Sequence, residues 1–155
     1  MIMKTKSELA EQCFKEGYNC AQATAMAFAE EMHMDIKDVA RMASSFGGGM
    51  GRLREVCGAC SAMFLVYGVL CGYDDPTDPD AKMNHYKDVQ ALGNAFKEKF
   101  GSRVCKEILA GYMTHISDDP IPTKRDDEFY KTRPCVRCVV AGARILSDFL
   151  ASKQH

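Results

Sequence analysis

Residues that cap helices stand in front of almost every apolar stretch of this chain. Ser7, Asn19, Asp35, Asp78 and Ser102 each precede a segment whose apolar residues recur at intervals of three and four. Side chains of these types accept hydrogen bonds from the free N–H groups of a first helical turn. No segment alternates between apolar and polar residues in the way that a half-buried strand does. The sequence therefore predicts an all-α protein.

The same signals predict where the helices begin and end. We expect helices after Ser7 up to Gly17, and over residues 20–33, 36–45, 57–71, 79–100, 102–115 and 135–153. The stretch 116–134 holds three prolines and should be irregular, with one helical turn near residues 126–130. A length of 155 residues suits one domain. We expect a single-domain helical bundle of about six to seven helices over residues 1–155.

Charge and hydropathy exclude several classes of protein. The net charge is −1, with 20 basic and 21 acidic residues, and no run of Lys or Arg is long enough to follow a phosphate backbone, so we expect no nucleic-acid binding. The longest apolar stretch, residues 59–71, contains Ser61 and Gly68 and is too short for membrane insertion. The N-terminal residues lack the apolar region of a secretory signal, so a cytoplasmic location is expected.

Cysteine is the residue type that most restricts function. In a reducing compartment, the eight cysteines are better explained by redox exchange or metal ligation than by a fixed disulfide framework. Four of them fall in the first turns of different expected helices, where free N–H groups and the helix dipole stabilise a thiolate. These are Cys20, Cys57, Cys105 and Cys135. Cys13 and Cys71 sit elsewhere in their helices and are interpreted as packing residues.

Two of these cysteines belong to CxxC pairs, Cys57-Gly-Ala-Cys60 and Cys135-Val-Arg-Cys138. This spacing places both sulfurs on one side of a first helical turn, so Cys60 and Cys138 are added to the candidate redox residues. Two such pairs could also form a four-thiolate metal site. Zinc ranks below redox chemistry, because both pairs lie on apolar helices that can fold without a metal.

A glycine-rich segment lies just before the first CxxC pair. Gly47, Gly48, Gly49 and Gly51 cannot sustain an ordinary helix and predict a loop. Their N–H groups could form a nest that holds an anion or cofactor together with Arg52 and the nearby Arg54. The competing interpretation is a structural loop that lets helices approach closely.

The sequence resembles the C_GCAxxG_C_C family of redox-active proteins over most of its length. The resemblance rests on the glycine segment, on Asn19-Cys20-Ala21, on Cys57-Gly-Ala, on Cys105-Lys-Glu-Ile108 and on a cysteine near the last helix. It implies roles for Cys20, Cys57, Cys105 and either Cys135 or Cys138. The chain departs from the pattern at Ala62, where the family has glycine, and in its extra Cys60.

Three functions follow as hypotheses. The first is a redox protein, either an oxidoreductase or an accessory protein, that cycles helix-start thiolates, with Cys57 foremost and Cys20 as its nearest partner. It would need no cofactor, and its counterpart would be a redox partner protein or a small-molecule oxidant. The second is an iron–sulfur or zinc protein with four ligands, Cys20, Cys57, Cys105 and Cys135. The third is a structural module whose apolar helices support a homo-oligomer.

Overall fold

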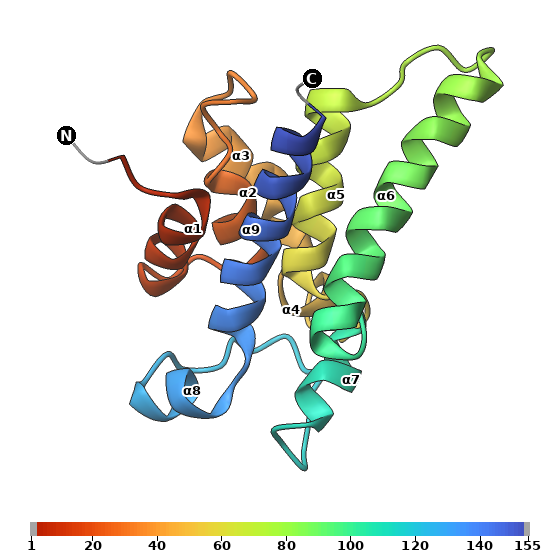
Figure 1. Ribbon diagram of the computed structural model, residues 1–155. Coiled ribbons are helices and arrows are strands. Elements are labelled where there is room, and N and C mark those ends of the chain that lie inside the picture. Colours follow the sequence, from red (N-terminus) through yellow and green to blue (C-terminus); the bar gives the residue numbers. More distant parts are fainter. Residues whose placement is uncertain (1–2, 154–155) are drawn as a thin grey trace.

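The computed structural model describes residues 3–153, and the fold over this range is all-α, as the sequence predicts (Figure 1). The only β pairing among these residues is an isolated bridge between Val56 and Val104. The helices are α1 (Lys6–Lys15), α2 (Cys20–Met26), α3 (Ile36–Ala43), α4 (Gly47–Met50), α5 (Gly58–Cys71), α6 (Pro79–Phe100), α7 (Cys105–Ala110), α8 (Asp127–Thr132) and α9 (Cys135–Ser152), with a 3-10 turn at Ser44–Phe46. Six of these α-helices have seven or more residues, which matches the expected bundle.

Local capping explains why several predicted helix starts are confirmed. Asn19 forms a capping box. Its side chain accepts from the backbone N–H of Gln22 at 2.9 Å, and the Gln22 side chain accepts from the backbone N–H of Asn19 at 3.0 Å. Asp35 and Asp78 cap α3 and α6 through their side chains alone, which accept from the N–H groups of Lys37 and Ala81. Gly101 ends α6 in the left-handed conformation.

Three predicted boundaries are wrong, each for a physical reason. Thr5 caps α1, because the Ser7 hydroxyl instead donates to the carbonyl of Val140 on α9. The helix predicted over residues 20–33 ends at Met26 and continues as turns with i to i−3 hydrogen bonds. The helix predicted over residues 102–115 is reduced to α7, since turns of the same kind follow Leu109.

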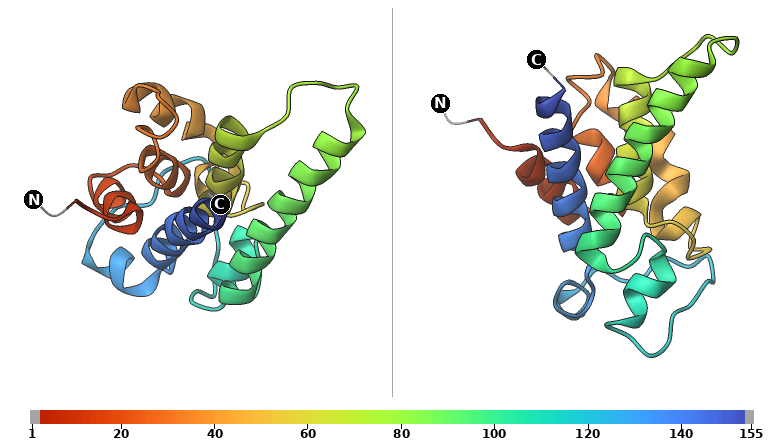
Figure 2. Two further views of the ribbon diagram at one scale, coloured as in Figure 1. Left: turned by 45° about the horizontal axis from the view of Figure 1, so that its top comes forward. Right: turned by 45° about the vertical axis from the view of Figure 1, so that its right-hand side comes forward.

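Helix α2 lies at the centre of the bundle and packs against α1, α3, α5 and α9. Its small side chains Ala21, Ala23 and Ala25 are fully buried and allow its neighbours to come close. Helices α5 and α9 also meet through small residues, because a Cβ on Gly142 would lie 3.4 Å from that of Ala59. Figure 2 (left) shows α9 between α1 and α6. Small residues therefore bring α2, α5 and α9 into close contact.

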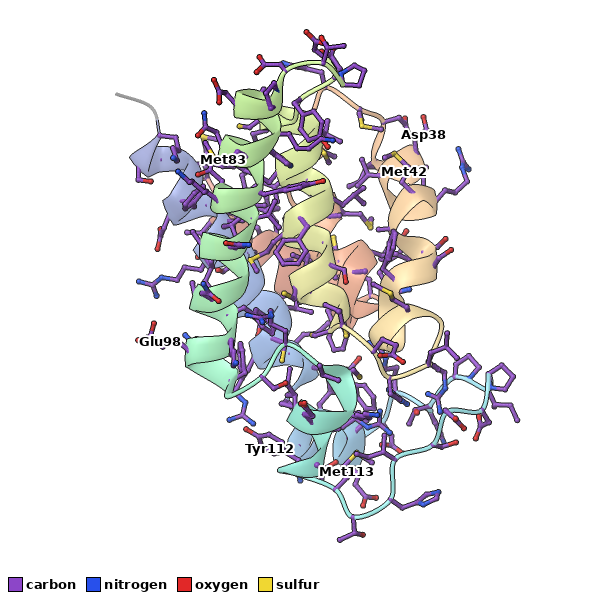
Figure 3. All side chains as sticks on the ribbon, turned by 90° about the vertical axis from the view of Figure 1, so that its right-hand side faces the viewer. Asp38, Met42, Met83, Glu98, Tyr112 and Met113 are labelled. Carbon is purple, nitrogen blue, oxygen red and sulfur yellow. The ribbon has the colours of Figure 1, made fainter. Side chains whose placement is uncertain are left out.

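The direction of the helices brings several N-termini to one end of the molecule. Helices α5 and α9 both begin at the lower end in Figure 1, and α6 runs in the opposite direction. The short helices α7 and α8 close that end. Helix α6 covers α5 and α9 from outside and leaves Met83 half exposed on its outer face (Figure 3). No helix within residues 3–153 is long and apolar enough to cross a membrane.

Candidate functional site

The glycine-rich segment forms a single left-handed turn instead of an ordinary loop. Residues 48 to 52 all have positive φ, between 63° and 71°, and the N–H of Gly51 donates to the carbonyl of Gly47 at 3.0 Å. Glycine adopts this conformation without a Cβ clash, whereas Met50, Arg52 and Arg54 each hold it at a cost of roughly 1–2 kcal/mol. Backbone strain of this kind clusters at functional sites.

The turn is followed by a short antiparallel contact that fixes two cysteines in register. The bridge between Val56 and Val104 lets the N–H of Cys57 donate to the carbonyl of Arg103 at 2.7 Å. The N–H of Cys105 donates to the carbonyl of Glu55 at 2.6 Å. Cys57 then caps α5, and Cys105 is the first residue of α7. Backbone pairing thus fixes the positions of two of the four predicted helix-start cysteines.

Five thiols from four different helix starts line one small cavity of about 40 Å³. They are Cys20, Cys57, Cys105, Cys135 and Cys138. Gly58 makes this convergence sterically feasible, because a Cβ at this position would lie 3.2 Å from the Cβ of Cys20 and 2.9 Å from the carbonyl oxygen of Phe46. The structure places both Cys135 and Cys138 at the cavity, so the two alternatives left open by the sequence are both part of it.

Cys20 and Cys135 form the first pair within this cluster. The hydrogen bond between their side chains lowers the pKa of Cys135 to about 7 and raises that of Cys20. Burial opposes the shift at Cys135, and Arg133, Arg125 and Arg54 add to it through their charge. Within this pair Cys135 is therefore the more acidic thiol, and Cys20 is its proton-bearing neighbour.

Cys57 and Cys138 form the second pair. A hydrogen bond with the Cys138 side chain lowers the pKa of Cys57 against the effect of burial. The N–H groups of Cys60 and Ala59 add to this stabilisation, as expected at the start of α5. The pKa of Cys138 is raised by the same hydrogen bond and by burial. The sequence analysis predicted Cys20 as the nearest partner of Cys57. The side-chain hydrogen bonds instead link each of these two residues to a cysteine of α9.

Cys105 has a cationic neighbour. Burial raises its pKa, and the guanidinium of Arg54 counteracts this, with Nη1 lying 3.6 Å from Sγ. The carbonyl of Ser117 accepts from Arg54 Nε at 2.9 Å and holds the guanidinium in place. The loop that contains Ser117 thus takes part in the site.

Three cysteines lie outside the cavity lining. Cys60 is fully buried in the core, where burial and the nearby Cys57 raise its pKa to about 12. It contributes its N–H to the site, and the predicted redox role of its thiol stays a prediction. Cys13 and Cys71, interpreted as packing residues, also lie away from the cavity, although Cys71 is exposed.

An open pocket of about 210 Å³ adjoins the thiol cavity and shares Cys20, Gly48, Arg54 and Cys135 with it. Of the predicted anion-binding residues, Gly47, Gly48 and Arg52 line this pocket, Gly49 lines the thiol cavity, and Gly51 lines neither.

Sequence reasoning missed Thr123, Arg125 and Arg133, which also line the pocket. They come from the segment expected to be irregular, where the cationic side chains of Arg125 and Arg133, close to Pro122 and Pro134, were the available signal.

The thiols lie close together without forming a ready-made ligand shell. Within the described residues 3–153, no group of three or more Cys, His, Asp or Glu side chains is arranged to hold a metal ion. All four predicted ligands line the cavity, namely Cys20, Cys57, Cys105 and Cys135. The side chains of Cys20 and Cys135 are hydrogen-bonded to each other. The metal-binding alternative stays a prediction.

Fold and site together define an all-α protein with a cluster of helix-start thiols. The chain belongs to the C_GCAxxG_C_C family, whose model, described as "Putative redox-active protein (C_GCAxxG_C_C)", matches residues 18–149. All five cavity cysteines lie within this match, and Cys13 lies outside it. The resemblance noted from the sequence is thereby confirmed. The comparisons with curated proteins and with solved structures gave no match.

Proposed function

We propose that the protein carries out thiol–disulfide exchange, with Cys135 as the attacking thiolate and Cys20 as the resolving thiol. The observation that carries this proposal is the convergence of five thiols on one cavity, with Cys20 and Cys135 in side-chain contact. A thiolate is the nucleophile in disulfide exchange. The pKa of Cys135 is lowered to about 7, and Cys135 also lines the open pocket through which a substrate would reach it. Membership of a redox-active family supports the same chemistry.

The exchange proceeds in two displacements. The Cys135 thiolate attacks one sulfur of a disulfide R–S–S–R, forms a mixed disulfide and releases RS⁻. Cys20 loses its proton, which reaches the released thiolate through solvent, and then attacks Cys135 Sγ and expels the second RS⁻. The protein gains a Cys20–Cys135 disulfide, and the substrate disulfide is reduced to two thiols. Cys57 and Cys138 offer a second pair of the same kind beside the first.

Thiol counting on anaerobically purified protein tests this proposal. We expect a colourless, metal-free protein that loses its cavity thiols in pairs when it is treated with a mild disulfide oxidant. Cys20→Ser should abolish the loss of the first pair. Cys71→Ser, which removes an exposed thiol away from the cavity, should leave that loss intact and serves as the control.

Two outcomes would overturn the proposal. A brown protein that contains iron would indicate a cluster bound by the cavity cysteines in place of dithiol cycling. Eight thiols that stay unreactive in the native state would indicate a structural role for the cysteines.

A further inference from the structure

The pocket above the first cysteine pair is lined by four arginines and no acidic residue. Arg52, Arg54, Arg125 and Arg133 surround an opening of about 210 Å³ that ends at Cys20 and Cys135. At roughly 30 Å³ per water molecule, this volume accommodates a fragment the size of about seven waters. It therefore suits a small molecule or one arm of it.

The arginines are held in place by neutral acceptors. Arg125 donates to the carbonyls of Phe14 and Tyr18, both at 2.9 Å, and its guanidinium lies over the Phe14 ring at 4.0 Å. Arg133 Nη2 donates to the hydroxyl of Thr123 at 3.3 Å. These bonds fix the orientation of each guanidinium and leave its charge uncompensated.

Carboxylates neutralise little of the positive charge of these arginines. Within residues 3–153, Arg52 is the one pocket arginine with a carboxylate oxygen inside 4 Å, that of Asp119 at 3.7 Å. Burial lowers the pKa of Arg52, and the charges of Arg54 and Arg133 lower it further, so the guanidinium groups repel one another. The single thiolate of Cys135 cannot balance three unpaired cations. An anionic ligand would remove this repulsion.

We propose that the arginine pocket binds a small disulfide that carries carboxylate groups and presents its sulfur atoms to Cys135. Arginine forks bind carboxylates with two parallel hydrogen bonds. Arg125 and Arg133 line the pocket and use two and one of their five N–H donors in the side-chain hydrogen bonds given above. This inference rests on the proposed thiol–disulfide exchange and names the substrate class of that site. The chemical step is the one given above, with R–S–S–R as a dicarboxylate, so one disulfide is reduced to two anionic thiols.

Three small disulfides of similar length and different charge test the inference. They are 3,3′-dithiodipropionate (anionic), bis(2-hydroxyethyl) disulfide (neutral) and cystamine (cationic). The rate of Cys20–Cys135 disulfide formation is measured at low salt and divided by the rate of each reagent with a free small thiol. We expect the anionic reagent to exceed the neutral one by about tenfold and the cationic one by more, because cationic clefts raise the local concentration of anions.

Two arginine variants sharpen the test. Arg133→Gln should reduce the ratio of anionic to neutral rates severalfold, since it removes one pocket charge whose guanidinium is hydrogen-bonded to the neutral hydroxyl of Thr123. Arg144→Gln changes an exposed arginine of α9 that lies outside the pocket and forms an ion pair with Asp148, so it should leave the ratio unchanged. Equal rates for the anionic and neutral reagents in the wild type would overturn the proposal that the arginine pocket binds anionic disulfides. They would not contradict the proposed thiol–disulfide exchange.

A non-reducible dicarboxylate separates binding from chemistry. Suberate has the length of 3,3′-dithiodipropionate and no disulfide, so calorimetry measures its affinity for the pocket alone. We expect weaker suberate binding to Arg133→Gln than to the wild type. If suberate binding depends on Arg133 but no disulfide oxidises Cys20 and Cys135, the proposal of an anion-binding pocket is supported and the proposed function is wrong. If suberate does not bind, the pocket is overturned.

Discussion

A guanidinium N–H of Arg54 points at the sulfur of Cys105, with 3.6 Å between Nη1 and Sγ. This contact partly offsets the burial that raises the pKa of Cys105. It also connects the thiol cavity to the arginine pocket, because Arg54 lines both. The two halves of the site are therefore electrostatically coupled.

Removing that cation should make Cys105 a weaker acid. In Arg54→Met we expect the pKa of Cys105 to rise further, since burial then acts without opposition, and its alkylation at neutral pH to slow severalfold. Peptide mass spectrometry after timed alkylation measures the rate at Cys105 alone. Arg54→Lys, which keeps the charge, should restore much of the rate. An unchanged rate in Arg54→Met would show that the contact does not influence the thiol.

The close approach of α2 and α5 predicts a steric effect at Gly58. In Gly58→Ala, the new methyl would lie 2.9 Å from the carbonyl oxygen of Phe46 and 3.0 Å from the backbone nitrogen of Ala21, and neither atom can move aside easily. We expect a loss of about 1–3 kcal/mol in the free energy of unfolding, measured with urea.

The same helix provides a matched control. A Cβ on Gly68 would meet nothing within 4 Å, so Gly68→Ala should stabilise the protein by about 0.5–1 kcal/mol through helix propensity. If both substitutions changed the free energy of unfolding alike, the close contact at Gly58 would not be a constraint on the fold.

The pH dependence of alkylation at Cys135 should reflect the pKa of its thiol. With a pKa of about 7, its alkylation rate should rise roughly tenfold per pH unit below pH 7 and level off above it. In Cys20→Ala the hydrogen bond that chiefly stabilises the thiolate is absent, so the midpoint should move to higher pH. A midpoint near 9 in the wild type, or one that Cys20→Ala does not move, would contradict the assignment.

Local signals explain what the sequence predicted well. The caps at Asn19, Asp35 and Asp78 act on the adjacent N–H groups, so the start of each helix is visible without knowing the fold. The ends were less visible, because burial of Phe28 and Met32 draws the chain into turns after α2. That effect depends on tertiary packing and not on the local sequence.

In the candidate site too, local features could be predicted from the sequence, and contacts that depend on tertiary packing could not. Four cysteines were placed at helix starts from local caps, glycines and a proline, and all four line the cavity. Their pairing was not visible, because Cys20 meets Cys135 through the packing of α2 against α9. Arg125 and Arg133 were missed for a related reason, since the segment between α7 and α9 folds back and brings them beside Cys20, which is distant from both in sequence.

Disulfide mapping tests the central claim most directly. The protein would be oxidised with one equivalent of 3,3′-dithiodipropionate, blocked with an alkylating reagent, digested without reduction and analysed by mass spectrometry. The account predicts that the peptides containing Cys20 and Cys135 are joined and that Cys13, Cys60 and Cys71 are found alkylated. A protein in which Cys20 and Cys135 both stay free, or are linked to cysteines outside the cavity, would contradict it.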